Sequence, residues 1–208
     1  MDLLTLSQWF IYFLFYSFIG WCIEIIWCAI ENKKLTNRGF LYGPLCPIYG
    51  FGALIVFGIY HLFQLPWWIN LILIIIACDV MEYLTSIVME KIFHLRWWDY
   101  TNNTKVSLNG RISLETSVCF GLGGLVAIYL AQPELEKFVT NIPGNILVPL
   151  ALTLFALYIL DTIVSWFVSL KAKTVLSGGK VDRTPEIKKY AAKFFLLPRP
   201  PKGKSNRS

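Results

Sequence analysis

Charged residues and recognisable metal or nucleotide motifs are scarce in this chain of 208 residues. Asp, Glu, Lys and Arg make up only 15% of it, well below the roughly 25% that is typical of soluble domains. The five cysteines form no CxxC pair, and only two histidines are present, so the sequence predicts no metal site. It also holds no GxxxxGK[ST] motif for nucleotide phosphates, since Ser177-Gly-Gly-Lys180 lacks the first glycine and the final hydroxyl residue. If ATP drives this protein, another polypeptide must hydrolyse it.

Long apolar runs are what the chain does contain. Hydrophobic residues make up 56% of it, and the mean hydropathy is +0.56. A transmembrane helix needs about 20 mostly apolar residues to cross the hydrocarbon core, and five runs approach this length: residues 9–30, 47–63, 68–93, 115–130 and 146–170. We therefore predict an all-α, polytopic transmembrane helical bundle with five spans over residues 1–170, followed by a basic cytoplasmic tail over residues 171–208.

The positions of the basic residues indicate how the spans are oriented, because Lys and Arg favour the cytoplasmic side of a membrane. Residues 1–8 and the connection after the second run hold no basic residue, and the connection after the fourth run holds only Lys137. The connections after the first and third runs hold seven, and the tail holds eleven. Five spans with the N-terminus outside and the C-terminus inside satisfy this pattern. The same rule accounts for the net charge of +6, so nucleic acid is not an expected partner.

The first apolar run is predicted to be a retained span. It is too long for the apolar region of a signal peptide, and no basic residue precedes it. With this topology all five cysteines lie in the membrane or on its cytoplasmic side, where disulfides are not expected.

The tail contains a candidate amphipathic helix. Thr184-Pro185-Glu186 is typical of a helix start, with threonine as the N-cap and proline at the first position. Apolar residues then follow helical spacing between lysines: Ile187, Tyr190, Ala191, Phe194 and Leu197. A short basic helix of this kind binds the inner membrane surface, so membrane lipids are predicted partners, and docking onto a partner protein is the alternative.

Acidic residues inside the spans carry the functional signal, because ionisable groups in hydrocarbon are costly and usually face the bundle interior. Glu24, Glu82 and Asp161 each lie about 21–22 Å from the outer end of their own run, counting 1.5 Å per residue. Three helices therefore place a carboxylate at a similar depth, in the cytoplasmic half. One face of the third run is polar over its length, with Asp79, Glu82, Ser86 and Glu90 at helical spacing.

The predicted inner connections add basic and aromatic residues on the same side. The first, residues 37–53, holds Arg38 together with glycines and prolines among aromatic residues, which predicts a compact re-entry into the second run. The second contains Arg96-Trp-Trp-Asp99 and Asn109-Gly-Arg111, and it ends at Glu115, whose carboxylate suits the N-terminus of the next helix. Guanidinium groups bind carboxylate or phosphate in a forked geometry.

Two interpretations of these residues remain open. In the first, the intramembrane carboxylates pair with the arginines and only hold the bundle together. In the second, they line a polar cavity that opens to the cytoplasm and binds a substrate, an ion or a lipid head group. The predicted substrate-binding residues are Glu24, Arg38, Glu82, Arg96, Asp99, Arg111, Glu115 and Asp161.

Several of these segments together resemble a known family. Residues 16–24, 37–53, 82–86, 96–100 and 109–111 are similar to bacterial membrane proteins described as "Putative ABC-transporter type IV", the CmpB-like family. The resemblance runs from about Leu14 to Glu115. It implies a permease-like subunit of an ABC transporter in a bacterial plasma membrane.

The resemblance also implies partners. A permease-like subunit needs a separate ATPase subunit, and five spans are few for a whole translocation path, so a homodimer or a partner membrane subunit is expected. Two other functions stay open: an accessory or regulatory membrane protein, and a membrane enzyme acting on a lipid head group. No pair of nucleophile and base is readable, and neither His61 nor His94 is predicted beside the acidic layer, so no catalytic residue or cofactor is predicted.

The orientation can be tested by cysteine labelling in intact cells. A cysteine placed near Gln64 should react with a membrane-impermeant thiol reagent, because that connection is predicted to lie outside, whereas one near Thr104 should react only after the membrane is opened. A variant without the five native cysteines serves as the background control. Labelling in the reverse pattern would show the topology to be wrong.

Overall fold

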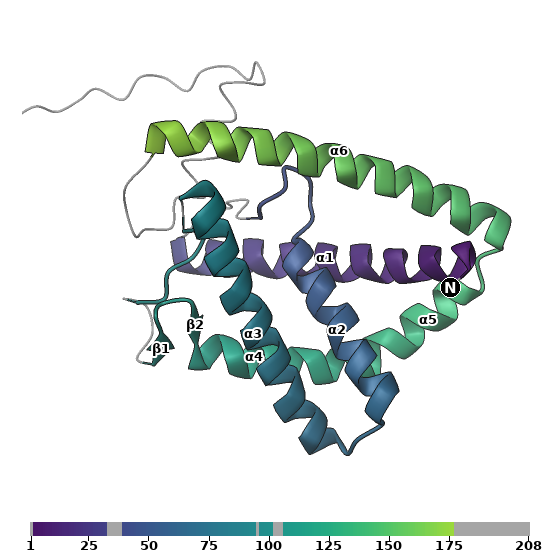
Figure 1. Cartoon of the computed structure of the whole chain (residues 1–208). Helices are drawn as coiled ribbons and strands as arrows, with labels where there is room; N and C mark the ends of the chain where they lie inside the picture. The colour runs from purple at the N-terminus through teal and green to yellow at the C-terminus, as the bar shows by residue number, and fades with distance from the viewer. Residues whose placement is uncertain (1, 33–38, 95, 102–105, 177–208) are drawn as a thin grey trace, which may run out of the picture.

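The computed structural model describes residues 2–32, 39–94, 96–101 and 106–176, and these are almost entirely helical (Figure 1). The helices are α1 (Leu3–Asn32), α2 (Pro47–Phe63), α3 (Trp67–Phe93), α4 (Leu114–Val126), the π-helix η1 (Ala127–Ala131), α5 (Gln132–Thr140) and α6 (Gly144–Leu176). Two short strands, β1 (Ser107–Leu108) and β2 (Ile112–Ser113), pair antiparallel before α4. The predicted all-α fold class is confirmed.

Four segments are helical, long and apolar enough to cross a membrane: Leu3–Ile30, Trp67–Phe93, Leu114–Thr140 and Gly144–Leu170. The second predicted span, α2, is an apolar helix of 17 residues, about 25 Å long at 1.5 Å per residue, which is shorter than a hydrocarbon core of about 30 Å. The four long helices support a multi-pass membrane protein, while the fifth predicted span is this shorter helix. The orientation in the membrane stays a prediction.

The fourth span is longer than the sequence predicts. The apolar run stops near residue 130, and the polar residues after it predict a connection, but α4, η1 and α5 follow one another without a break to Thr140. These polar residues suit a helix, because Lys137 Nζ lies 2.7 Å from Glu134 Oε1 one turn away. Pro133 stands in this continuous helix directly after η1, where the π-turn interrupts the regular α-helical hydrogen bonding. Only residues 141–143 connect α5 to α6.

The last helix also runs past its predicted boundary. α6 continues to Leu176, beyond residue 170, and the predicted tail helix over residues 184–197 lies outside the described residues. α6 lies along α1 (Figure 1) through aromatic contacts. The ring centroids of Phe10 and Phe155 are 5.4 Å apart, and those of Phe13 and Tyr158 are also 5.4 Å apart.

Glycines allow α1 and α2 to approach each other closely. A methyl group on Gly50 of α2 would lie 2.6 Å from the carbonyl oxygen of Phe13 on α1, and Gly20 of α1 faces the side chain of Tyr49. Beside this contact lies the main buried apolar cluster, built from α1, α2, α3 and η1: Tyr16, Ala53, Val56, Phe57, Ile74 and Ile128. The close packing of α1 on α2 fixes where the polar residues of both helices point.

This packing predicts a sharp difference between two glycines of the same helix. Gly50→Ala should lower the thermal unfolding temperature in detergent, because the added methyl group meets backbone that cannot rotate away, at a cost of about 1–3 kcal/mol. Gly58→Ala is the matched control, because no atom lies within 4 Å of a methyl group there. An equal effect of both substitutions would contradict the close contact between α1 and α2.

Candidate functional site

The polar face of α3 makes contacts with three different parts of the chain. Ser117 of α4 donates from its hydroxyl to Asp79, at 2.8 Å from Oδ2 and 2.9 Å from Oδ1. Tyr100 donates from its hydroxyl to Glu82 Oε1 at 3.1 Å. Arg111 donates to Ser86 Oγ at 2.7 Å. Carboxylates and hydroxyls that would be costly in hydrocarbon are thus turned toward polar partners.

An ion-pair network lies at the end of the bundle where α3 ends. Glu90 Oε2 accepts from Arg111 Nη2 and lies 3.6 Å from Arg96 Nε. Arg96 is only 7% exposed, and it donates to Asp99 Oδ2 at 2.8 Å and to the carbonyl oxygen of Asn109 at 3.1 Å. The guanidinium of Arg111 also lies over the ring of Tyr83, 5.8 Å from its centroid.

Asp99 is held in its charged form by the same network. Burial alone raises the pKa of this carboxyl, but hydrogen bonds from the Thr101 hydroxyl and backbone N–H and from Arg96 outweigh that effect. The pKa of Asp99 therefore lies below its usual value. Asp99 remains a carboxylate at neutral pH and neutralises part of the charge of Arg96.

A tight turn between β1 and β2 brings Arg111 into position. Asn109 and Gly110 both have a positive φ, +54° and +67°, a combination typical of Asn-Gly hairpin turns. Gly110 has no room for a side chain, because a methyl group there would lie 3.3 Å from Arg96 Nη1 and still closer to Asp99 and Thr101. The turn is tied to the preceding segment, since Tyr100 N–H donates to the carbonyl oxygen of Gly110 at 2.9 Å.

A second group of carboxylates lies deeper in the bundle, and we call Glu24, Asp79 and Glu82 the acidic cluster. Glu24 and Asp79 both lie within electrostatic range of Glu82. Tyr49 of α2 donates from its hydroxyl to Glu24 Oε1 at 2.7 Å, as Tyr100 does to Glu82 Oε1 at 3.1 Å. The structure therefore brings two of the predicted site residues, Glu24 and Glu82, into one group.

Glu82 is the residue of this cluster with the least compensation. Its side chain is 4% exposed, and its Oε2 atom has no hydrogen-bond partner among the described residues. No described Lys or Arg forms an ion pair with Glu82 or with Asp79, whereas Arg96 and Arg111 are engaged with Glu90 and Asp99. A buried carboxylate oxygen of this kind costs free energy until a cation, a proton or a donor reaches it.

Asp161 of α6 has a different environment. Its two oxygens accept from the backbone N–H groups of Tyr42 at 3.0 Å and Gly43 at 2.8 Å, and Ser165 donates to it at 3.2 Å. No hydrogen bond joins Asp161 to Glu82 within the part of the chain that is described. Asp161 also lines a mainly apolar groove of about 800 Å³ between α1 and α6. Its hydrogen bonds to Tyr42 and Gly43 fasten the loop before α2.

Of the other predicted residues, Glu115 lies apart from both groups. Glu115 is exposed in the first turn of α4, where its charge suits the helix dipole, and Arg38 lies outside the described residues. Sequence reasoning did not find the tyrosine partners of Glu24 and Glu82, because a hydroxyl donor gives no periodic signal. No group of three or more His, Cys, Asp or Glu residues suited to a metal ion occurs over the described ranges.

Comparison with known proteins agrees with this membrane architecture. Neither the curated proteins nor the solved structures gave a match to the chain. The sequence profile of the family described as "Putative ABC-transporter type IV" matches residues 11–166, well over half of the chain. This match includes α2, α3, the β1–β2 hairpin and the acidic cluster. The chain therefore belongs to the ABC-transporter type IV (CmpB) family of that description.

Proposed function

We propose that this chain is the membrane-embedded, permease-like subunit of an ABC-type transport system in a bacterial plasma membrane. Within it, the acidic cluster contacts the positively charged part of the ligand that is moved. The observation that carries this proposal is the carboxylate of Glu82, which is buried in the bundle with one oxygen unpartnered among the described residues. Membership of the ABC-transporter type IV family supports the transport role.

The charges of Asp79 and Glu82 favour a cationic ligand. Among the described residues these two carboxylates have hydroxyl partners, which do not neutralise a carboxylate. The described arginines, Arg96 and Arg111, are already bound by Glu90 and Asp99, so they are not free to bind an anionic ligand. A cation that enters the bundle regains from these carboxylates part of the solvation that it loses on leaving water.

A separate ATPase is part of the proposal, because the chain has no nucleotide-binding motif of its own. The hairpin formed by β1 and β2 is a suitable docking element for such a partner. Exposed apolar side chains lie on and beside it, namely Val106, Leu108 and Leu114, and the network around Glu90 holds it against α3. A rigid element with exposed apolar residues is what a docking surface requires. Four long helices are also few for a translocation path, so a second membrane subunit or a second copy is required.

The partner is tested by purifying the tagged full-length chain from its native host in a mild detergent. We expect an ATPase subunit to co-purify in stoichiometric amount, identified by mass spectrometry. Leu108→Asp should release it, because a charge is placed in the proposed docking surface, and Leu62→Asp on the exposed end of α2 is the control. Recovery of a bound lipid or another membrane protein without any ATPase would overturn the permease role.

The acidic cluster is tested by Glu82→Gln in the same purified complex. The substitution keeps the side-chain shape and removes the charge, so ATP hydrolysis by the complex should fall at least tenfold in its ligand-stimulated part. The unfolding temperature should stay equal or rise, because an incompletely compensated buried charge is lost.

Glu134→Gln is the matched control, since Glu134 is an exposed carboxylate on α5 whose ion pair with the exposed Lys137 contributes little to stability. It should leave both hydrolysis and stability unchanged. If Glu82→Gln instead prevents the protein from folding or inserting, Glu82 is part of a structural network, and the proposed ligand site is wrong.

A further inference from the structure

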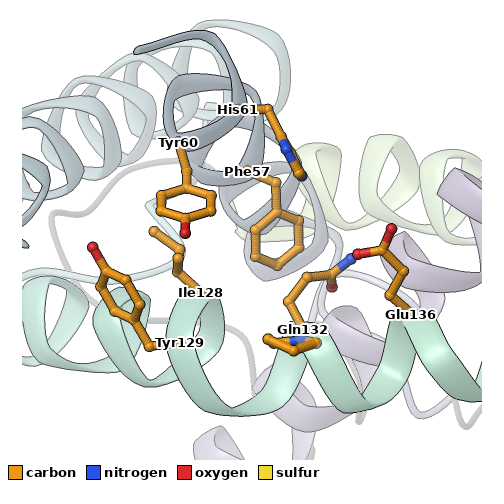
Figure 2. A pocket seen from close by; sticks show the side chains of 8 residues that line it. Phe57, Tyr60, His61, Ile128, Tyr129, Gln132 and Glu136 are labelled. Atoms are coloured by element: carbon orange, nitrogen blue, oxygen red, sulfur yellow. The ribbon is translucent and has the colours of Figure 1, made fainter. Parts of the chain in front are cut away.

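A small pocket lies at the opposite end of the bundle from the acidic cluster, between the last turns of α2 and the junction of η1 with α5 (Figure 2). Its volume is about 140 Å³. The residues that line it are Phe57, Tyr60, His61, Ile128, Tyr129, Gln132, Pro133 and Glu136. This volume is below the roughly 300–1,000 Å³ that is usual for sites of drug-sized ligands, so the pocket suits a small molecule or a small group.

The π-helix η1 forms part of the wall of this pocket. In η1 the N–H of Gln132 donates to the carbonyl oxygen of Ala127, five residues back, and the extra residue in this turn shifts the helix surface. Single π-turns inside α-helices occur frequently at functional sites. Here Tyr129 and Gln132 line the pocket at the end of α2. Phe57, Ile128 and Gln132, which also line it, are each less than 9% exposed.

One side of the pocket is negatively charged. Figure 2 shows Glu136 and Gln132 next to one another on the α5 side, with His61 above them on α2. Glu136 forms no ion pair with any described residue, since Lys137 on the same helix is bound by Glu134. No Lys or Arg lines the pocket. The carboxylate of Glu136 would therefore repel an anionic ligand, whereas a cation would find an opposite charge that has no ion-pair partner among the described residues.

The other side of the pocket is aromatic. The rings of Tyr60 and Tyr129 stand almost perpendicular, with centroids 5.6 Å apart, and both lie on the same side in Figure 2, with Phe57 between them and Gln132. Tyr129 is held by Asn70, which donates to its hydroxyl at 3.1 Å. Aromatic faces attract cations through the quadrupole of the ring, and this attraction is strongest for ligands such as ammonium groups that shed their water readily.

We propose that this pocket binds a small organic cation, a methylated or unmethylated ammonium group. Glu136 supplies the opposite charge, and Tyr60, Tyr129 and Phe57 supply the aromatic surface. Inorganic cations are a poor fit, because apart from Glu136 the pocket offers few oxygen ligands and a hard metal ion prefers several. The proposal stands on this pocket alone and does not depend on the transport role or on the orientation in the membrane.

Tetramethylammonium is the probe for this site. We expect it to bind to the purified full-length protein in detergent with a dissociation constant in the millimolar range or tighter, as measured by isothermal titration calorimetry. tert-Butanol, which has a similar shape without the charge, should bind at least tenfold more weakly.

Two substitutions separate charge from packing. Glu136→Gln should weaken tetramethylammonium binding at least tenfold. Glu134→Gln, which removes another exposed carboxylate of the same helix, should leave the binding unchanged. Tyr129→Leu keeps an apolar side chain but removes the aromatic face and should also weaken binding. Because Glu136 and Glu134 are both exposed, neither substitution is expected to disturb folding.

Three results would overturn the proposal. One is the absence of any tetramethylammonium binding by the correctly folded protein. Another is equal binding of tert-butanol, which would make the pocket a simple apolar cavity. The third is binding that Glu136→Gln leaves unchanged, which would place the cation elsewhere on the protein.

Discussion

Glu90 is the residue on which the end of the bundle near the hairpin depends, because one carboxylate at the last turns of α3 contacts two arginines from a long connection. Arg96 and Arg111 lie far apart along this connection, and each also binds a second group, Asp99 or Ser86. Through these contacts the connection folds back on α3, and Tyr100 is carried to Glu82. Without this network the buried Arg96 would lack a counter-charge. A buried charge without a partner strongly destabilises a folded protein.

The two groups of predicted site residues therefore have different physical roles. The charges of Arg96, Arg111, Glu90 and Asp99 compensate one another. Their ion pairs hold the hairpin against the end of α3. Within the described part of the chain, Asp79 and Glu82 are compensated only by hydroxyls, and Glu82 only in part. Asp161 fastens two backbone N–H groups of the loop before α2. Charged residues that look alike in the sequence pattern thus differ in the structure: some form ion pairs or bind backbone N–H groups, whereas Glu82 keeps one oxygen without a hydrogen-bond partner among the described residues.

Hydropathy predicted the helices well, because the apolar runs leave the backbone no other way to satisfy its hydrogen bonds. Hydropathy failed where polar residues continue a helix. Glu134 and Lys137 suggest a loop by their polarity, yet they lie on a helix and pair with one another across one turn. The shared face of Asp79, Glu82, Ser86 and Glu90 followed from helical spacing alone. The partners of these residues did not, since the contacts of Tyr49 with Glu24 and of Asp161 with backbone N–H groups depend on how distant segments meet.

The π-helix at Ala127–Ala131 belongs to the same class of features, because it leaves no mark in hydropathy. Tyr129 lies within it and Gln132 directly after it, and both line the pocket at the end of α2 together with Glu136, which follows one turn later. The acidic cluster and the pocket beside η1 lie at opposite ends of the bundle, yet both combine carboxylates with aromatic side chains, and ion pairing satisfies neither Glu82 nor Glu136 among the described residues. A cation beside either carboxylate is attracted by its charge, and an anion is repelled. The ligands proposed for the two ends of the bundle therefore carry the same sign of charge.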